Sequence, residues 1–151
     1  MTRVMFVCHG NICRSPMAEF IMKKLVRDAG RESEFIIASS ATSTEEIWNG
    51  VGNPVYPPAR EELKKHGIEC GGKRAVQLTA ADAEKYDLFL CMDSANLRNA
   101  KRILGQKAEG KVKKLLDLAG GGDVADPWYS DRFDIAYADI LRGCEALIKS
   151  I

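Results

Sequence analysis

The chain has 151 residues, 46% of them hydrophobic, which is enough for one domain with a hydrophobic core. Its 22 basic and 21 acidic residues nearly cancel, so charge gives no reason to expect a nucleic-acid or membrane partner. No apolar run approaches the roughly 20 residues of a membrane helix, and no signal peptide is visible. We therefore expect a single cytoplasmic domain spanning residues 1–151.

The five cysteines are Cys8, Cys13, Cys70, Cys91 and Cys144. An odd number without a secretory signal favours reduced thiols in a cytoplasm. Zinc is a poor fit because Cys8 and Cys13 are too far apart for the usual two-residue knuckle, and only two histidines are available. We predict no metal and no cofactor.

Residues 8–16 read Cys-His-Gly-Asn-Ile-Cys-Arg-Ser-Pro, between an apolar run at 4–7 and an amphipathic segment that begins at Met17. This order predicts strand, loop and helix. A loop that opens a helix presents free backbone N–H groups and the positive end of the helix dipole, so it favours an anion. Gly10 and Asn11 are residue types that readily adopt a positive φ, which a loop folding back on itself needs.

Two side chains give this loop its chemistry. Arg14 carries a planar guanidinium that can hold two oxygens of a phosphate at once. Cys8 lies at the end of the strand, among the same donors, so we expect its thiol to ionise readily. The pattern predicts a thiolate nucleophile beneath a bound phosphate.

The rest of the chain alternates strands and helices. Strands are predicted near residues 35–38, 87–92 and 112–118, helices at 15–29, 57–67, from 79, from 93 and from 133, and a loop at 45–56. Strands separated by helices indicate a parallel sheet with right-handed crossovers. Ligands of such sheets bind at the C-terminal ends of the strands, where Cys8 and Ser39 are expected.

The run at 8–16 resembles the signature loop of the low-molecular-weight protein tyrosine phosphatases. The likeness covers nearly the whole chain, including Leu90-Cys91-Met92-Asp93 followed by Asn96-Leu97-Arg98, and Asp126-Pro127 followed by two aromatic residues. It implies a three-layer α/β/α, phosphatase I-like fold with a four-stranded parallel sheet. It weakens between 69 and 77, which leaves open whether that segment supports the loop.

The resemblance implies hydrolysis of phosphotyrosine in proteins and inhibition by phosphate-like oxyanions. Cys8 would attack phosphorus, Arg14 would hold the phosphoryl oxygens, and Asp126 would protonate the leaving phenolate. The remaining loop residues expected to contact substrate are His9, Gly10, Asn11, Ile12, Cys13 and Ser15. Ser39 would support the loop by holding Asn11. Family members also form a protective disulfide at the position of Cys13, which implies redox regulation through Cys8.

Ile12 and three aromatic residues, Trp48, Trp128 and Tyr129, are expected to form a deep slot suited to a phosphotyrosine ring. Trp48 could instead cover the core as a lid. Protein arginine phosphatases of the same fold carry Thr at the position of Ile12, and isoleucine cannot accept a hydrogen bond from a guanidinium.

Two further functions are compatible with the loop. Thioredoxin-coupled arsenate reductases share it but need two additional cysteines close in sequence, whereas Cys70 and Cys91 are well separated. A phosphate-binding module without turnover is the second, and it leaves Cys8, Arg14 and Asp126 without a reason to occur together.

Overall fold

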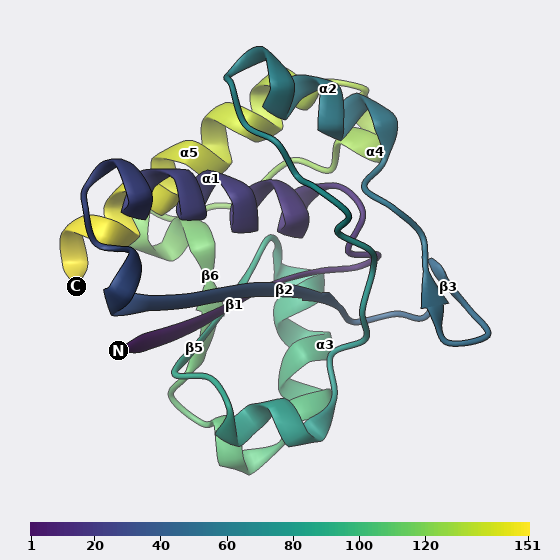
Figure 1. Ribbon diagram of the computed structural model, residues 1–151. Helices are drawn as coiled ribbons and strands as arrows, with labels where there is room; N and C mark the ends of the chain where they lie inside the picture. The colour runs from purple at the N-terminus through teal and green to yellow at the C-terminus, as the bar shows by residue number, and fades with distance from the viewer.

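A four-stranded parallel sheet forms the middle layer of the computed structural model, which describes residues 1–151 (Figure 1). The strands are β1 (Thr2–Cys8), β2 (Phe35–Ala41), β5 (Leu88–Cys91) and β6 (Val112–Lys114), in the order β2-β1-β5-β6. Every neighbouring pair is parallel. The predicted fold class is confirmed.

Five α-helices surround the sheet. Two hydrophobic cores, one large and one small, lie between the helices and the sheet. They are α1 (Arg14–Asp28), α2 (Pro57–Lys65), α3 (Ser94–Leu104), α4 (Pro127–Ser130) and α5 (Phe133–Ser150). Helices α1, α2 and α5 lie on one face of the sheet, and α3 lies on the other (Figure 1). None of the helices combines the length and the apolar character needed to cross a bilayer.

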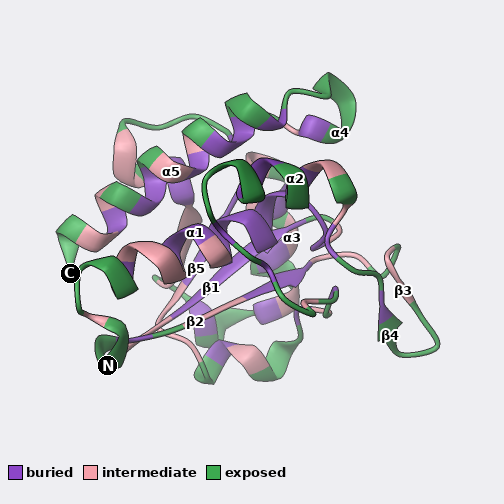
Figure 2. Cartoon of the chain, turned by 45° about the horizontal axis from the view of Figure 1, so that its top comes forward, coloured by how far each residue is buried: buried purple, intermediate pink, exposed green.

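Strand β1 shows how the sequence builds both cores. Val4 and Phe6 pack into the larger core beneath α1 and α5, while Met5 and Val7 pack into the smaller core against α3. All four are at most 4% exposed, since successive side chains of a strand point to opposite faces and both faces are covered. Figure 2 shows β1 as one of the most buried parts of the chain. The strand therefore delivers Cys8 to the edge of the sheet on a rigid support.

The predicted loop at 45–56 contains a small hairpin, β3 (Ile47–Trp48) paired with β4 (Val51–Gly52). Its two turn residues, Asn49 and Gly50, both have positive φ, 49° and 76°. Asn-Gly is a strong sequence signal for such a turn, so the sequence held the information that this segment is not irregular.

The predicted strand at 112–118 is wrong in its second half. The strand ends at Lys114, and a 3-10 helix (Leu115–Ala119) follows. The side chain of Asp117 accepts a hydrogen bond of 3.0 Å from the backbone N–H of Lys114, which caps the helix start. Gly120, with φ 97°, ends it. An apolar run alone did not distinguish the two structures.

Three further 3-10 helices are Glu32–Glu34, Ala80–Glu84 and Gln106–Ala108. The second is the helix predicted from residue 79, and a capping box between Thr79 and Asp82 begins it. Strand β2 runs three residues beyond the predicted end and includes Ser39.

Candidate active site

The loop between β1 and α1 begins at Cys8, the last residue of the strand, and ends at Arg14, the first of the helix. Asn11 has φ 58°, as predicted for a loop that folds back on itself. Gly10 has no positive φ, so that expectation is wrong. Its small size matters instead, because a Cβ there would lie 3.2 Å from Cγ of Glu46.

The sulfur of Cys8 lies among donors from the loop and the first turn of α1. The backbone N–H groups of Asn11 and Ser15 donate to Sγ at 3.3 and 3.4 Å. Ser15 Oγ lies 3.0 Å from the same sulfur. The loop therefore surrounds Sγ with the groups that stabilise a thiolate, while the cysteine itself is only 3% exposed.

The side chain of Asn11 holds the loop in shape from below. Its Nδ2 donates to Ser15 Oγ at 2.8 Å and to Ser39 Oγ at 3.0 Å. Its Oδ1 accepts a hydrogen bond of 3.0 Å from the backbone N–H of Val76. The predicted contact between Ser39 and Asn11 is present in the structure. The segment where the resemblance weakened also supports the loop, through a backbone group that does not depend on the side chain.

Glu19 and Lys73 extend this network, and sequence reasoning missed both. Ser39 Oγ donates to Glu19 Oε1 at 2.6 Å. Lys73 Nζ donates to the Ser39 carbonyl at 3.0 Å and lies 3.7 Å from Glu19 Oε1. Burial lowers the pKa of Lys73, and Glu19 opposes that shift. The signal for Glu19 was its position one helical turn after Ser15, on the same face.

Arg14 is 3% exposed and is oriented by acceptors from two distant segments. Its Nη1 donates to Asp93 Oδ2 at 2.8 Å and to the Val124 carbonyl at 3.0 Å. Its Nη2 lies 3.6 Å from Asp126 Oδ2. Burial would lower the pKa of Arg14, but the neighbouring Cys8 and the two carboxylates outweigh it and raise the pKa above its ordinary value.

Asp126 reaches this edge of the sheet because Val124 N donates to the carbonyl of Met92, just after β5, at 2.8 Å. Asp126 caps α4, its Oδ1 accepting from Trp128 N at 3.0 Å. The other oxygen is free to face the cavity near Arg14. Its side chain is 31% exposed, so the carboxyl group meets both solvent and the loop.

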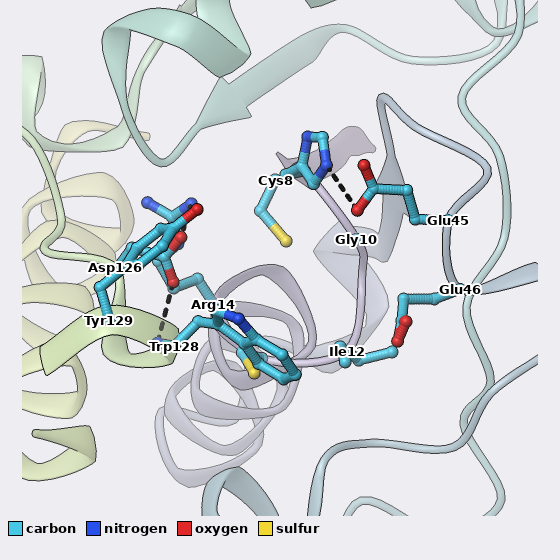
Figure 3. A pocket seen from close by; sticks show the side chains of 11 residues that line it. Cys8, Gly10, Ile12, Arg14, Glu45, Glu46, Asp126, Trp128 and Tyr129 are labelled. Carbon is cyan, nitrogen blue, oxygen red and sulfur yellow. Dashed lines mark hydrogen bonds and ion pairs between the residues drawn. The ribbon is translucent and has the colours of Figure 1, made fainter. Parts of the chain in front are cut away.

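These groups enclose a cavity of about 240 Å³ (Figure 3). The lining residues are Cys8, His9, Gly10, Ile12, Cys13, Arg14, Glu45, Glu46, Asp126, Trp128 and Tyr129. Figure 3 shows Asp126 and Tyr129 on one side of the Cys8 sulfur and Glu45 and Glu46 on the other. No group of three or more His, Cys, Asp or Glu side chains is arranged to hold a metal ion.

Some of the residues that were predicted to contact the substrate do not line the cavity. Asn11 and Ser15 lie beneath the loop, where they are at most 1% exposed. Trp48 is 79% exposed and does not line the cavity, and it is no lid over the core. Ile47 packs against the core, which turns the next side chain of the hairpin to solvent.

Glu45 and Glu46 occupy the part of the wall that Trp48 was expected to form, and sequence reasoning missed them. Glu45 Oε2 lies 3.0 Å from His9 Nε2. Across the cavity, Trp128 packs on Tyr56 with ring centroids 5.1 Å apart, so the wall is aromatic on that side.

Cys13 shares the cavity with Cys8 but is a different kind of thiol. Burial, followed by the charges of Cys8 and Asp126, raises the pKa of Cys13 to about 12. It is therefore protonated at neutral pH. All five cysteines are free thiols.

The family model described as low molecular weight phosphotyrosine protein phosphatase matches residues 3–151. The chicken low molecular weight phosphotyrosine protein phosphatase is 40% identical, over 97% of this chain and 93% of its own. The crystal structure of YfkJ from Bacillus subtilis has a TM-score of 0.92 at 35% identity, covering 100% of this chain and 94% of its own.

The structure of Vibrio vulnificus Wzb in complex with benzylphosphonate has a TM-score of 0.86 at 28% identity, covering 99% of each chain. The family model, the relative and the two solved structures each match almost the full length of this chain. The chain belongs to the low-molecular-weight phosphotyrosine protein phosphatase family.

Proposed function

We propose that the cavity hydrolyses phosphotyrosine in proteins through a cysteinyl-phosphate intermediate on Cys8. One observation carries the proposal, the convergence of a thiol, a guanidinium and a carboxyl group on one cavity. Cys8 lies at its buried end, Arg14 beside it, and Asp126 closer to solvent. This is the arrangement that a nucleophile, an oxyanion-binding group and a general acid require.

In the first step, Sγ of Cys8 attacks phosphorus and forms an S–P bond. The P–O bond to the tyrosine ring breaks, and its electron pair stays on the phenolic oxygen, which takes a proton from Asp126. Arg14 and the backbone N–H groups of the loop hold the non-bridging oxygens, where charge is spread in the transition state. Arg14 needs no reorientation, because Asp93 and Val124 already hold its Nη1.

In the second step, water attacks phosphorus and gives a proton to the carboxylate of Asp126. The S–P bond breaks, its electrons return to sulfur, and inorganic phosphate is released. Ser15 Oγ, 3.0 Å from Sγ, can donate a hydrogen bond to the departing thiolate. The same carboxyl group therefore acts as an acid and then as a base.

The cavity favours an aryl phosphate. Ile12 and Trp128 give it apolar walls, and phosphoserine is too short to bring its phosphorus to the buried Cys8 sulfur. Wzb of Vibrio vulnificus, solved with benzylphosphonate, supports a ring attached to an oxyanion as the recognised unit. We infer that phosphate-like oxyanions inhibit this protein by competing for the loop.

The same site distinguishes tyrosine phosphatase activity from the competing reactions. A phosphoarginine guanidinium would find the aliphatic side chain of Ile12 where it needs an acceptor, so tyrosine is favoured. Cys70 and Cys91 are both buried and neither lines the cavity, which disfavours a disulfide relay of the arsenate reductase kind. Free thiols throughout support a reducing, cytoplasmic location.

Turnover of p-nitrophenyl phosphate and of a phosphotyrosine peptide tests the proposal. We expect none for Cys8→Ser, and a loss of roughly 100- to 10,000-fold in kcat for Asp126→Asn on the peptide. The loss should be smaller on p-nitrophenyl phosphate, since nitrophenolate leaves without much help. Asp131→Asn is the matched control, because Asp131 is an exposed carboxylate outside the cavity whose φ of 60° suits asparagine.

An equal loss of kcat on both substrates would show that Asp126 is not the general acid. The assigned substrate class would be overturned if the wild type hydrolysed phosphoarginine faster than phosphotyrosine and Ile12→Thr did not increase the phosphoarginine rate further. Arsenate reduction coupled to thioredoxin would favour a redox function.

A further inference from the structure

One wall of the cavity is negatively charged, and the reaction described above does not use it. Glu45 and Glu46 line the cavity opposite Asp126 and Tyr129, with the Cys8 sulfur between the two sides (Figure 3). Whatever part of a substrate flanks the phosphorylated ring must pass these two carboxylates.

The two glutamates are held beside the loop by backbone contacts. Thr42 N and Ser43 N donate to the carbonyls of Cys8 and His9, each at 3.0 Å. The carbonyl of Glu46 accepts from Asn53 N at 2.8 Å. These bonds hold the backbone of the segment before the hairpin beside the phosphate loop, so the side chains of Glu45 and Glu46 start next to the cavity.

Gly10 lets Glu46 approach the loop closely. A Cβ on this glycine would lie 3.2 Å from Cγ of Glu46, so the aliphatic part of the glutamate packs against the loop where the glycine leaves space. The carboxylate is consequently placed at the cavity rather than extended into solvent.

The two carboxylates differ in how far they are already neutralised. Glu45 Oε2 lies 3.0 Å from His9 Nε2, with side chains 70% and 50% exposed. Glu46 makes no ion pair and no side-chain hydrogen bond. Arg14 is the one lysine or arginine that lines the cavity, and it is paired with Asp93 and Asp126 and would also bind the phosphate. Glu46 is thus the free acceptor on this wall.

We propose that Glu46, assisted by Glu45, is a specificity-determining residue that selects phosphotyrosine with a neighbouring lysine or arginine and rejects a neighbouring glutamate or aspartate. The inference rests on the proposed function and names the substrate class of that site. A basic side chain next to phosphotyrosine gains Glu46 as an ion-pair partner, because no cation of the protein already pairs with it. An acidic side chain in the same place meets a like charge.

The size of the effect follows from the partial exposure of the wall. Exposed ion pairs contribute little each, and attraction and repulsion add when basic and acidic peptides are compared. We expect kcat/KM to favour a basic peptide over an acidic one by about tenfold at low salt. The preference should shrink as ionic strength rises, since exposed charges are screened.

The experiment compares three phosphotyrosine peptides that differ only in the residues next to phosphotyrosine, which are lysine, alanine or glutamate. The ratio of kcat/KM for the lysine and glutamate peptides is measured for each variant. Glu46→Gln should reduce the ratio to about threefold or less, and Glu46→Lys should invert it. Glu109→Gln is the control of equal charge change, because Glu109 is exposed and precedes β6 at the opposite edge of the sheet. It should keep the wild-type ratio.

The outcomes separate the two proposals. Wild type that hydrolyses neither p-nitrophenyl phosphate nor any of the peptides would end the proposed function. Wild type that hydrolyses all three peptides at similar rates, or a Glu46→Gln ratio equal to the wild-type ratio, would refute the role of Glu46 and leave the phosphatase activity standing.

Discussion

Arg14 and Asp93 form an ion pair of 2.8 Å between two segments that are far apart in the sequence, with side chains 4% and 22% exposed. The nitrogen that donates to Asp93 also donates to the Val124 carbonyl. The guanidinium is therefore oriented before a phosphate arrives, and the enzyme does not have to order it during the reaction.

Replacing Asp93 with Asn tests this orientation. Asp93 also caps α3, its Oδ1 accepting from Asn96 N at 2.8 Å, and asparagine caps about as well. We expect kcat/KM for phosphotyrosine to fall by roughly 10- to 100-fold, because a hydrogen bond to a charged group is worth about 1.5–3 kcal/mol. Steady-state kinetics and urea unfolding measure the two properties. Wild-type kcat/KM in a variant of normal stability would contradict the role of Asp93.

Ser39 and Ser40 offer a matched pair of buried hydroxyls, each 1% exposed. Ser39 Oγ accepts from Asn11 and donates to Glu19, whereas Ser40 Oγ has no partner. Ser39→Ala should cost about 1–3 kcal/mol of unfolding free energy, since it leaves buried polar groups unpaired. It should also lower kcat, because Asn11 shapes the loop.

Ser40→Ala removes only an unpaired hydroxyl, so its stability should equal or exceed that of the wild type. Urea denaturation of both variants makes the comparison. Equal destabilisation by the two changes would show that the serines matter by packing alone.

From the buried thiol of Cys91 we predict that the protein loses stability at high pH. Burial raises the pKa of Cys91 from 9.0 to about 12, with the charges of Asp93 and Cys8 adding to the shift. Between these values the unfolded chain has lost the proton that the folded chain keeps, so the stabilisation is complete below pH 9 and is lost as pH rises toward 12.

From pH 9 to 10.5 we expect this thiol to account for about 1–2 kcal/mol of the loss in unfolding free energy. Urea titrations at several pH values give the slope of the unfolding free energy against pH for wild type and for Cys91→Ala. The quantity to measure is the difference between these two slopes, because the contributions of the other titrating groups cancel in it. Identical slopes would show that Cys91 is not protonated in the folded chain at pH 10.

Cys8 and Cys13 line the same cavity and are both free, which is consistent with the redox regulation that the resemblance implies. We expect dilute peroxide to abolish activity and a dithiol to restore it, with thiol mapping showing a bond between the two residues. In Cys13→Ser the loss should become irreversible as Cys8 oxidises further. Full recovery of the serine variant would argue against protection by Cys13.

The sheet, the C-terminal helix α5 and the chemistry of the loop could be predicted from the sequence, because each depends on residues that are close together in the chain. Residues 8–15 lie on one continuous strand, turn and helix, so their spacing alone brings the thiol, the amides and the guanidinium together. The side of the hairpin that faces the cavity was not predictable in this way. Side chains alternate along a strand, so a shift of one residue exchanges Trp48 for its neighbours.

By itself, then, the sequence determined the fold class and the nucleophilic loop. The tertiary structure decided which distant residues complete the site, among them Asp93 at Arg14, Glu19 and Lys73 beneath Ser39, and Glu46 at the wall. The physical reason is that these contacts depend on where the ends of parallel strands and their following loops meet in space, and sequence spacing does not encode that meeting.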